Sequence, residues 1–195
     1  AAAAAAAAPA TAPQSASLTG HYALVFSTVV LRLGTAAGND APAKKKKATV
    51  QPDAQAVDAL RAFVDCTGDD VLGKAAAANY ERAARVPDYA DVATALAAAV
   101  GEAHGSRQMR AIYAVLLPYM KGNFPHQRVV AASVLAEFVN HAGADAVLMR
   151  QLVNALLASL VDNNLKVYAL RGLGNVVAAG APPPPPPPRR RRRRR

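Results

Sequence analysis

An internal repeat in the second half of the chain restricts the fold more than any other feature. Residues 109–120, MRAIYAVLLPYM, align with residues 149–160, MRQLVNALLASL, at an offset of 40. The stretches that follow, QRVVAASVLAEFV and LKVYALRGLGNVV, align at an offset of 38. The two-residue difference falls in a turn, where chain length varies at little free-energy cost. A repeated unit of two helices predicts an array of stacked pairs, because one pair cannot bury its apolar face alone.

Basic residues recur at equivalent positions of the two repeat copies. Arg110 coincides with Arg150, and Arg128 corresponds to Lys166. We expect these side chains to project from the repeat helices, where they could contact a protein partner. The candidate protein-contact residues are therefore Arg110, Arg128, Arg150 and Lys166. Ordinary solvated surface is the alternative interpretation for each of them.

The segment before the repeat also predicts helices. Residues 18–33 are densely apolar and contain strand formers such as Val25 and Phe26, so periodicity alone leaves helix and strand open. Their span of about three turns and the helical segments downstream favour a helix. Further helices are predicted over residues 54–65, 71–78 and 89–100, with N-caps from Asp53, from Asp69 or Asp70, and from Asp88.

The repeat itself predicts helices over residues 107–120, 127–141 and 165–179, with one more beginning near Met149. Pro118 should loosen the last turn of the first of these. Gly172 and Gly174 are expected where a neighbouring helix comes close. The last helix should leave Leu170, Leu173, Val176 and Val177 partly uncovered. Such a face predicts either an interface or a missing continuation of the array, and we favour the continuation.

Composition divides the chain into three segments. Residues 1–17 are Ala/Pro-rich without apolar periodicity and are predicted to be disordered. Residues 18–180 form the helical repeat domain, with a loop at 34–52 that carries a run of four lysines. Residues 181–195 form a polyproline and polyarginine tail, also predicted to be disordered.

The positive charge is local. The formal charge is +10, but without the seven arginines of the tail and the four lysines of the loop it is −1. The tail could bind phosphates of nucleic acid or of an anionic membrane in a salt-dependent, sequence-nonspecific way. Docking of the proline run to an aromatic-lined domain and nuclear targeting by the lysines are weaker alternatives. The candidate phosphate-contact residues are Arg189, Arg190, Arg191, Arg192, Arg193, Arg194 and Arg195.

The sequence contains no recognisable catalytic or metal-binding constellation. The four histidines lie in separate segments and form no metal-ligand spacing. Glu102 and His104 could act as an acid–base pair, but a Gly-flanked connector is the better interpretation. Cys66 has no neighbouring cation in the sequence to activate its thiol. We expect no enzyme, no cofactor, no metal and no small-molecule substrate.

A pair period near 40 is typical of HEAT and armadillo solenoids. Asp162, Val167 and Leu173-Gly174 match the HEAT turn and second helix, whereas Tyr168 stands where Arg is usual. Together with HYALVFSTVVLRLG, DALRAFV and QRVVAASVLAEFV, the segment LVDNNLKVYALRGLGNV resembles the maestro-related HEAT-repeat family over roughly residues 18–177. The resemblance implies a large cytoplasmic solenoid without catalytic residues, linked in some members to membrane trafficking.

These observations predict an all-α, right-handed, HEAT/armadillo-like solenoid of about four helix pairs. Its expected function is that of a scaffold or adaptor for protein partners whose identity is unknown. Nucleic-acid or anionic-membrane binding through the arginine tail is the alternative, and a truncated gene product without an independent role is a third. No stretch reaches the roughly 20 apolar residues of a membrane span, and the single cysteine favours a reducing compartment. We therefore expect a soluble cytoplasmic protein.

Overall fold

The computed structural model describes residues 20–38, 52–83, 88–143 and 145–180, and these ranges contain helices and no strand. This confirms the all-α helical-repeat prediction. The elements, in chain order, are α2 (Tyr22–Gly38), α3 (Pro52–Thr67), α4 (Asp70–Ala77), α5 (Tyr80–Ala83), α6 (Tyr89–Leu116), the 3-10 helix η1 (Leu117–Lys121), α7 (Pro125–Phe138), α8 (Ala146–Ser159) and α9 (Lys166–Gly180).

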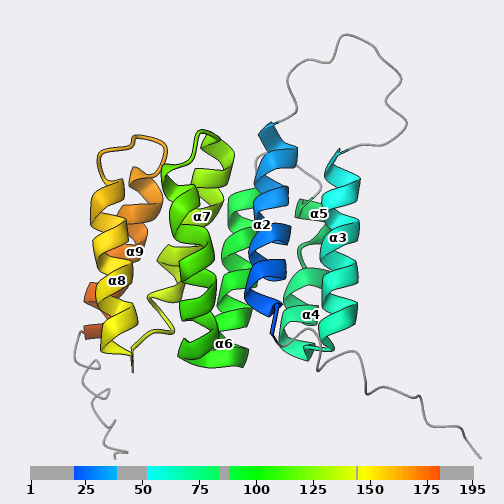
Figure 1. Ribbon diagram of the computed structural model, residues 1–195, viewed down its shortest axis with the longest axis horizontal. Coiled ribbons are helices and arrows are strands. Elements are labelled where there is room, and N and C mark those ends of the chain that lie inside the picture. Colours follow the sequence, from blue (N-terminus) through cyan, green and yellow to red (C-terminus); the bar gives the residue numbers. More distant parts are fainter. Residues whose placement is uncertain (1–19, 39–51, 84–87, 144, 181–195) are drawn as a thin grey trace, which may run out of the picture.

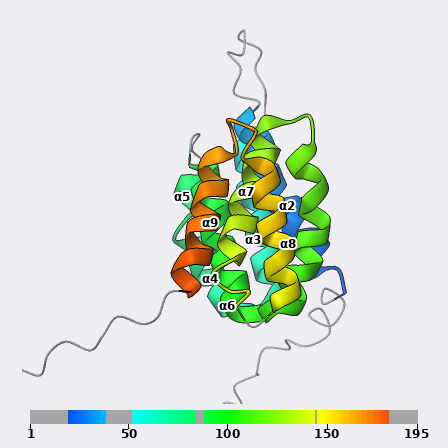
Figure 2. The same cartoon turned by 90° about the vertical axis from the view of Figure 1, so that its left-hand side faces the viewer.

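The helices form two layers (Figures 1 and 2). One layer, called the first layer here, holds α3, α2, the second part of α6 with η1, and α8. The second layer holds α4, α5, the first part of α6, α7 and α9. The helix α6 crosses between the layers at Gly105, whose φ of 65° and ψ of −170° interrupt the helical geometry. Only glycine adopts that conformation without strain, so the crossing depends on this residue.

The pairs do not follow the chain order. The helix α2 packs against α3 on one side and against α6 and α7 on the other. It therefore pairs with the first part of α6 and lies inside the stack, between the α3 pair and the repeat (Figure 1). The four pairs are α3 with α4 and α5, α2 with the first part of α6, the second part of α6 with α7, and α8 with α9. This agrees with the predicted number of pairs, but the place of α2 was not predicted.

Several predicted helix boundaries differ from the structure by a few residues, and two of the differences have a clear structural reason. The loop predicted from residue 34 begins too early, because α2 continues to Gly38. A Cβ at Gly34 would lie 2.9 Å from the His126 carbonyl oxygen. Gly34 therefore does not end the helix; its missing side chain allows α7 to pack closely against α2. The helices predicted separately over residues 89–100 and 107–120 are both part of α6, and the interruption between them is confined to Gly105, whereas Gly101 is helical and lies beneath the His141 ring. The loosened turn at Pro118 is confirmed, since η1 replaces α-helix there.

A continuous apolar core joins the pairs. Phe26, Leu96, Ile112, Phe138 and Leu152 are almost completely buried, and each comes from a different helix or part of a helix. Burying a side chain of this size contributes about 1.5–3 kcal/mol relative to leaving it exposed. Stability therefore comes mainly from packing between neighbouring pairs.

The predicted N-caps are borne out in part. The Asp69 side chain accepts hydrogen bonds from the Val71 and Leu72 amides at the start of α4. Asp88 makes no capping hydrogen bond, and its carboxylate lies 3.7 Å from the Arg82 guanidinium instead. Its backbone is helical, so the side chain does not reach back to the first free amides. The side chain of Asp53 lies outside the described residues.

Candidate protein-binding surfaces

A shallow groove runs across the second layer. Its volume is about 390 Å³, and it is lined by residues of α5, α6, α7 and α9, so every helix pair contributes to it. We call this surface the second-layer groove. Its lining residues are Arg82, Asp91, Thr94, Ala95, Ala98, Glu137 and Arg171.

The groove has a small-residue floor and a charged rim. On α6, Asp91, Thr94, Ala95 and Ala98 follow the i, i+3, i+4, i+7 spacing of one helix face. The methyl groups of the two alanines leave room for another chain to lie close to the helix. This spacing was present in the sequence, but the run of alanines around it gave no sign of which face stays open.

The rim carries both signs of charge. Arg82 lies 3.4 Å from Asp91, and Glu137 accepts a hydrogen bond from the Asn140 side chain at 2.9 Å. Arg171 forms no ion pair within the described part of the chain. Burial, and secondarily the charge of Asp91, raise the pKa of the neighbouring Tyr168, so this phenol stays neutral. Arg171 is therefore the rim charge that is free to meet an acidic group of a ligand.

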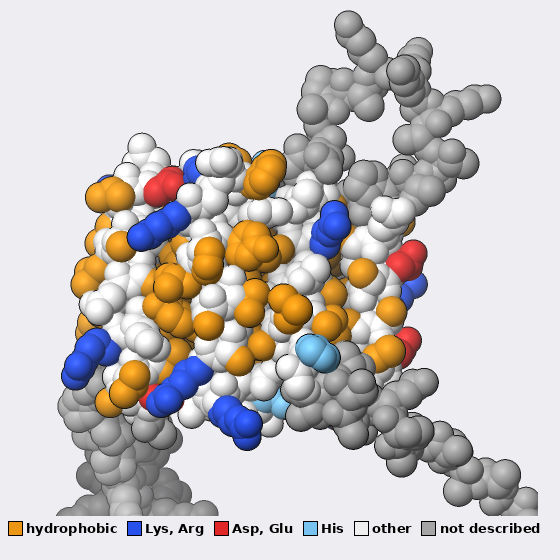
Figure 3. Space-filling view, in the orientation of Figure 1, with side chains coloured by type: hydrophobic (Ala, Val, Ile, Leu, Met, Phe, Trp, Pro, Cys, Tyr) orange, Lys and Arg blue, Asp and Glu red, His pale blue; other side chains and the backbone are white. Residues whose placement is uncertain are grey.

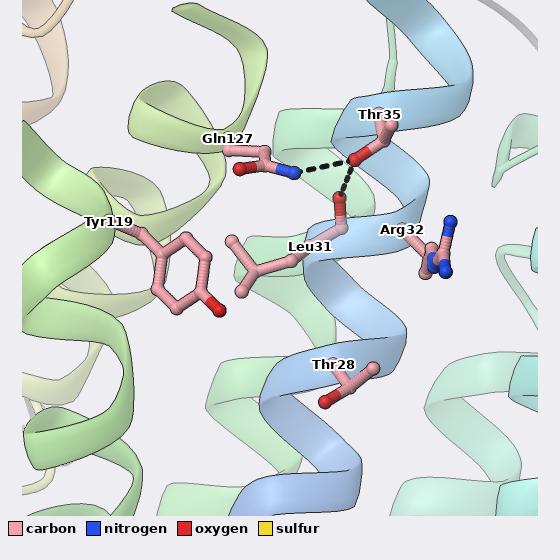
Figure 4. A pocket seen from close by; sticks show the side chains of 6 residues that line it. All are labelled: Thr28, Leu31, Arg32, Thr35, Tyr119 and Gln127. Carbon is pink, nitrogen blue, oxygen red and sulfur yellow. Dashed lines mark hydrogen bonds between the residues drawn. The ribbon is translucent and has the colours of Figure 1, made fainter. Parts of the chain in front are cut away.

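A second hollow lies on the first layer, between α2 and the segment from η1 to α7 (Figure 4). Its volume is about 330 Å³. Gln127 donates to the Thr35 hydroxyl at 2.8 Å, and Thr35 donates to the Leu31 carbonyl at 2.9 Å. Because these polar groups already bond one another, the hollow offers a ligand mainly the Tyr119 hydroxyl and the Arg32 guanidinium, which point in different directions (Figure 4).

Two of the predicted contact residues join neighbouring pairs. Arg110 of α6 donates two hydrogen bonds of 2.6 Å to Asp145, the N-cap of α8. These bonds and the Leu148 amide lower the pKa of Asp145 to about 2. Arg128 of α7 lies 3.2 Å from Asp162 in the turn between α8 and α9. This ion pair uses Arg128, whose equivalent in the last pair is Lys166 and not Tyr168, so it does not depend on the residue at position 168.

The other two, Arg150 and Lys166, are exposed on the last pair, and no ion pair joins them to a described residue. Figure 2 faces the side of the molecule on which α8 and α9 lie. Large apolar side chains are exposed with them, including Leu157 at 50%, Leu170 at 54% and Val177 at 74%. We call Arg150, Leu157, Val161, Lys166, Leu170 and Val177 the α8–α9 face. The prediction that this side of α9 is partly uncovered is confirmed, because Leu170 and Val177 are exposed and Leu173 and Val176 are half-buried.

The first-layer face has its own pattern of side chains. Hydrophobic side chains gather across the middle of this face, and most Lys and Arg side chains lie toward its margins (Figure 3). Exposed apolar side chains are common on the surfaces of monomeric proteins, and this distribution identifies no site by itself.

The histidines make contacts between elements. His104 lies 2.6 Å from the Asp69 carboxylate, and its ring contacts the Tyr22 ring in a tilted arrangement, so it pairs with the N-cap of α4 rather than with Glu102. His126 shares a hydrogen bond of 3.0 Å with the Tyr89 hydroxyl. No group of three His, Cys, Asp or Glu side chains that could hold a metal occurs among the described residues. Cys66 is exposed.

Several predictions concern residues outside the described ranges. These are the N-terminal segment 1–17, the lysine run and the phosphate-contact arginines of the tail. In the described portion, no helix has both the length and the apolar character needed to cross a membrane.

Comparison with known proteins agrees with the repeat architecture. The family model described as "SGR6, HEAT repeats" matches residues 10–142. The chain is 31% identical over 171 residues to Maestro heat-like repeat-containing protein family member 1 of Dictyostelium discoideum. This match covers 82% of the chain but 10% of the relative, so the chain spans about a tenth of that relative's length. No solved structure matches the chain.

Proposed function

Because the chain belongs to the maestro-related HEAT-repeat family, we propose that it is a non-catalytic scaffold that binds a polypeptide segment of a partner protein in the second-layer groove. One observation carries this proposal, namely that second-layer helices of all four pairs line a single groove. Stacked repeats present such extended surfaces because each pair adds one helix to the same side. A ligand along the groove therefore contacts several pairs at once.

The side chains of the groove suit an extended segment with small residues in the middle and a charge at one end. Ala95 and Ala98 leave space for backbone or small side chains. Arg171 would pair with an aspartate or glutamate of the segment, and a polar group of the segment would approach Thr94 from the solvent side of the groove. The Thr94 hydroxyl already donates to the Ala90 carbonyl at 2.9 Å, so it can serve the ligand as an acceptor.

Two finer parts of the proposal rest on the family resemblance and on the sequence. We propose that the partner acts in intracellular membrane trafficking, as the resemblance implied for some members. We also propose a cytoplasmic location, which the single cysteine favours. The alternative function, phosphate binding by Arg189–Arg195, concerns residues outside the described ranges.

Affinity capture with matched variants tests the proposal. The intact chain would be used to recover partners from cell extract at low and high salt, in parallel with Arg171→Glu and Ala98→Arg. The first variant reverses the unpaired rim charge, and the second fills the floor of the groove. We expect both to lose at least tenfold in affinity for a recovered partner, measured afterwards by titration with the purified partner.

Two controls separate the groove from other surfaces. Arg107→Glu reverses an exposed arginine of α6 outside the groove, and deletion of Arg189–Arg195 removes the tail. Both should leave binding to the purified partner unchanged. Binding that survives both groove variants but is lost with the tail, or at high salt alone, contradicts the proposal and supports the phosphate-binding alternative.

A further inference from the structure

The two ion pairs that join the last two helix pairs share one pattern. In the step from α6–α7 to α8–α9, a basic residue of each helix reaches a carboxylate of the next pair. Arg110 in the first-layer helix meets the N-cap Asp145, and Arg128 in the second-layer helix meets the turn residue Asp162. These contacts lie at opposite ends of the pair, so together they fix how the next pair is seated.

The repeat places the same two basic residues on the last pair. Arg150 is the equivalent of Arg110 at the offset of 40, and Lys166 is the equivalent of Arg128 at the offset of 38. Both side chains are exposed, and neither forms an ion pair with another described residue. The last pair thus keeps the basic half of each contact, and the acidic half is missing within the described residues.

Apolar residues of α9 also occupy positions equivalent to apolar residues of the preceding repeat copy. Ala132 of α7 and Val139, which directly follows this helix, are completely buried, and α7 packs against both α8 and α9. Their equivalents on α9, Leu170 and Val177, are 54% and 74% exposed and are larger or equal in size. On α9, Lys166, Leu170 and Val177 follow i, i+4, i+11 spacing and share one side of the helix. On α8, Arg150 and Leu157 are seven residues apart and also share a side.

We propose that the α8–α9 face seats a further helix pair of the same repeat, continuing the array. The seated pair carries an acidic N-cap on its first helix, opposite Arg150, and an acidic residue in its inter-helix turn, opposite Lys166. Charge complementarity at two defined points and an apolar strip between them select this occupant over an arbitrary apolar partner. The relative is about ten times as long as the aligned stretch, which leaves ample sequence for further pairs.

A tandem duplication supplies such a pair in a defined form. Residues 1–177 followed by residues 140–195 keep the full chain and place a second copy of Asp145 and Asp162 after the α8–α9 face. We expect the extended chain to unfold in a single thermal transition with a higher midpoint than the original. Arg150→Glu in the first copy should then lower the midpoint by several degrees in the extended chain. In the original chain, where no ion pair joins Arg150 to a described residue, it should lower the midpoint by less than about one degree.

Charge exchange provides the sharper measurement. In the extended chain, Asp145→Arg in the inserted copy should restore part of the midpoint lost with Arg150→Glu, because the pair is remade with reversed sign. Lys166→Glu with Asp162→Lys in the inserted copy should behave in the same way. Arg107→Glu is the matched control and should shift the midpoints of both chains equally.

Several outcomes overturn the proposal. They are equal effects of Arg150→Glu in the two chains, two separate transitions in the extended chain, no rescue by charge exchange, and a dimer of the original chain that Arg150→Glu dissociates. The last outcome assigns the face to a second copy. Because the inserted pair exposes an apolar face of its own, a version with Leu170→Gln and Val177→Gln in the inserted copy is made in parallel. If neither version unfolds cooperatively, the proposal is also overturned.

Discussion

At the residue scale, the contacts between pairs depend on a few side chains with specific geometry. Asp145 is both the N-cap of α8 and the partner of Arg110, so one carboxylate serves the helix and the joint between pairs. Its lowered pKa of about 2 compares with an ordinary value of about 3.9, so the folded state favours the charged form.

The lowered pKa of Asp145 predicts how stability depends on pH. Its contribution is fully present above the ordinary pKa and is lost as the pH falls toward 2, because the proton then binds the folded form as well. The free energy of unfolding, measured with urea between pH 2 and pH 7, should be lower for Asp145→Asn at neutral pH and should converge on the original near pH 2. Arg110→Ala should reduce the same acid dependence, because it removes the main cause of the lowered pKa. Parallel curves at every pH would contradict this prediction.

Two glycines of α9 should respond to alanine in opposite ways. A Cβ at Gly172 would lie 2.6 Å from a Leu156 methyl and 3.0 Å from the Ala136 backbone, whereas nothing lies within 4 Å of one at Gly174. The sequence-based expectation of close packing is therefore right for Gly172 and wrong for Gly174, which is exposed. Gly172→Ala should cost about 1–3 kcal/mol through overpacking. Gly174→Ala should gain up to about 1 kcal/mol from helix propensity, and chemical denaturation of both variants measures the contrast.

At the scale of elements, α6 determines how the two halves of the molecule are joined. Its first part lies in the second layer with α2 as partner, and its second part lies in the first layer beside α8. The change of layer at Gly105 puts α6 into two successive pairs without a long connection.

Replacement of Gly105 tests this geometry. Gly105→Ala should lower the free energy of unfolding by about 1–3 kcal/mol, because φ near 65° with ψ near −170° is strained for any residue with a Cβ. Gly73→Ala in α4 is the control, since the nearest atom to its Cβ would be a Val64 methyl at an ordinary 3.5 Å. That substitution should be neutral or slightly stabilising. Equal effects of the two changes would show that the bend does not depend on glycine.

At the scale of the whole molecule, α2 connects parts of the stack that are distant in sequence. It packs against α3, α6 and α7, and Gln127 donates a hydrogen bond to Thr35 across 92 residues of chain. Because α2 contacts three other helices, its loss would uncover all of them, and we therefore expect the array to unfold as one unit.

A substitution on each side of α2 measures this coupling. Phe26→Ala removes an almost fully buried ring and should cost about 3–5 kcal/mol. The whole chain should still unfold in one transition, at a lower temperature. Leu24→Ala, at a position 56% exposed, should change the free energy of unfolding by no more than about 0.5 kcal/mol. Two transitions after Phe26→Ala would show that the pairs unfold independently.

The sequence alone determined the helices, the repeat and the exposed side of α9, because helical periodicity and turn chemistry are local properties. It also identified Arg110, Arg128, Arg150 and Lys166, because a repeat makes equivalent positions visible. Only the tertiary structure separated them into two that join pairs and two that remain exposed, since Arg110 meets an aspartate 35 residues away.

The place of α2 and the second-layer groove were likewise decided by tertiary structure. Packing between helices depends on residues that are distant in sequence. Several alanine-rich helix faces could pack equally well against a neighbouring helix, so the spacing of residues in the sequence does not tell which face remains exposed. In this protein the stacking order placed Ala95 and Ala98 of α6 in the open groove and completely buried the neighbouring Ala93 and Leu96.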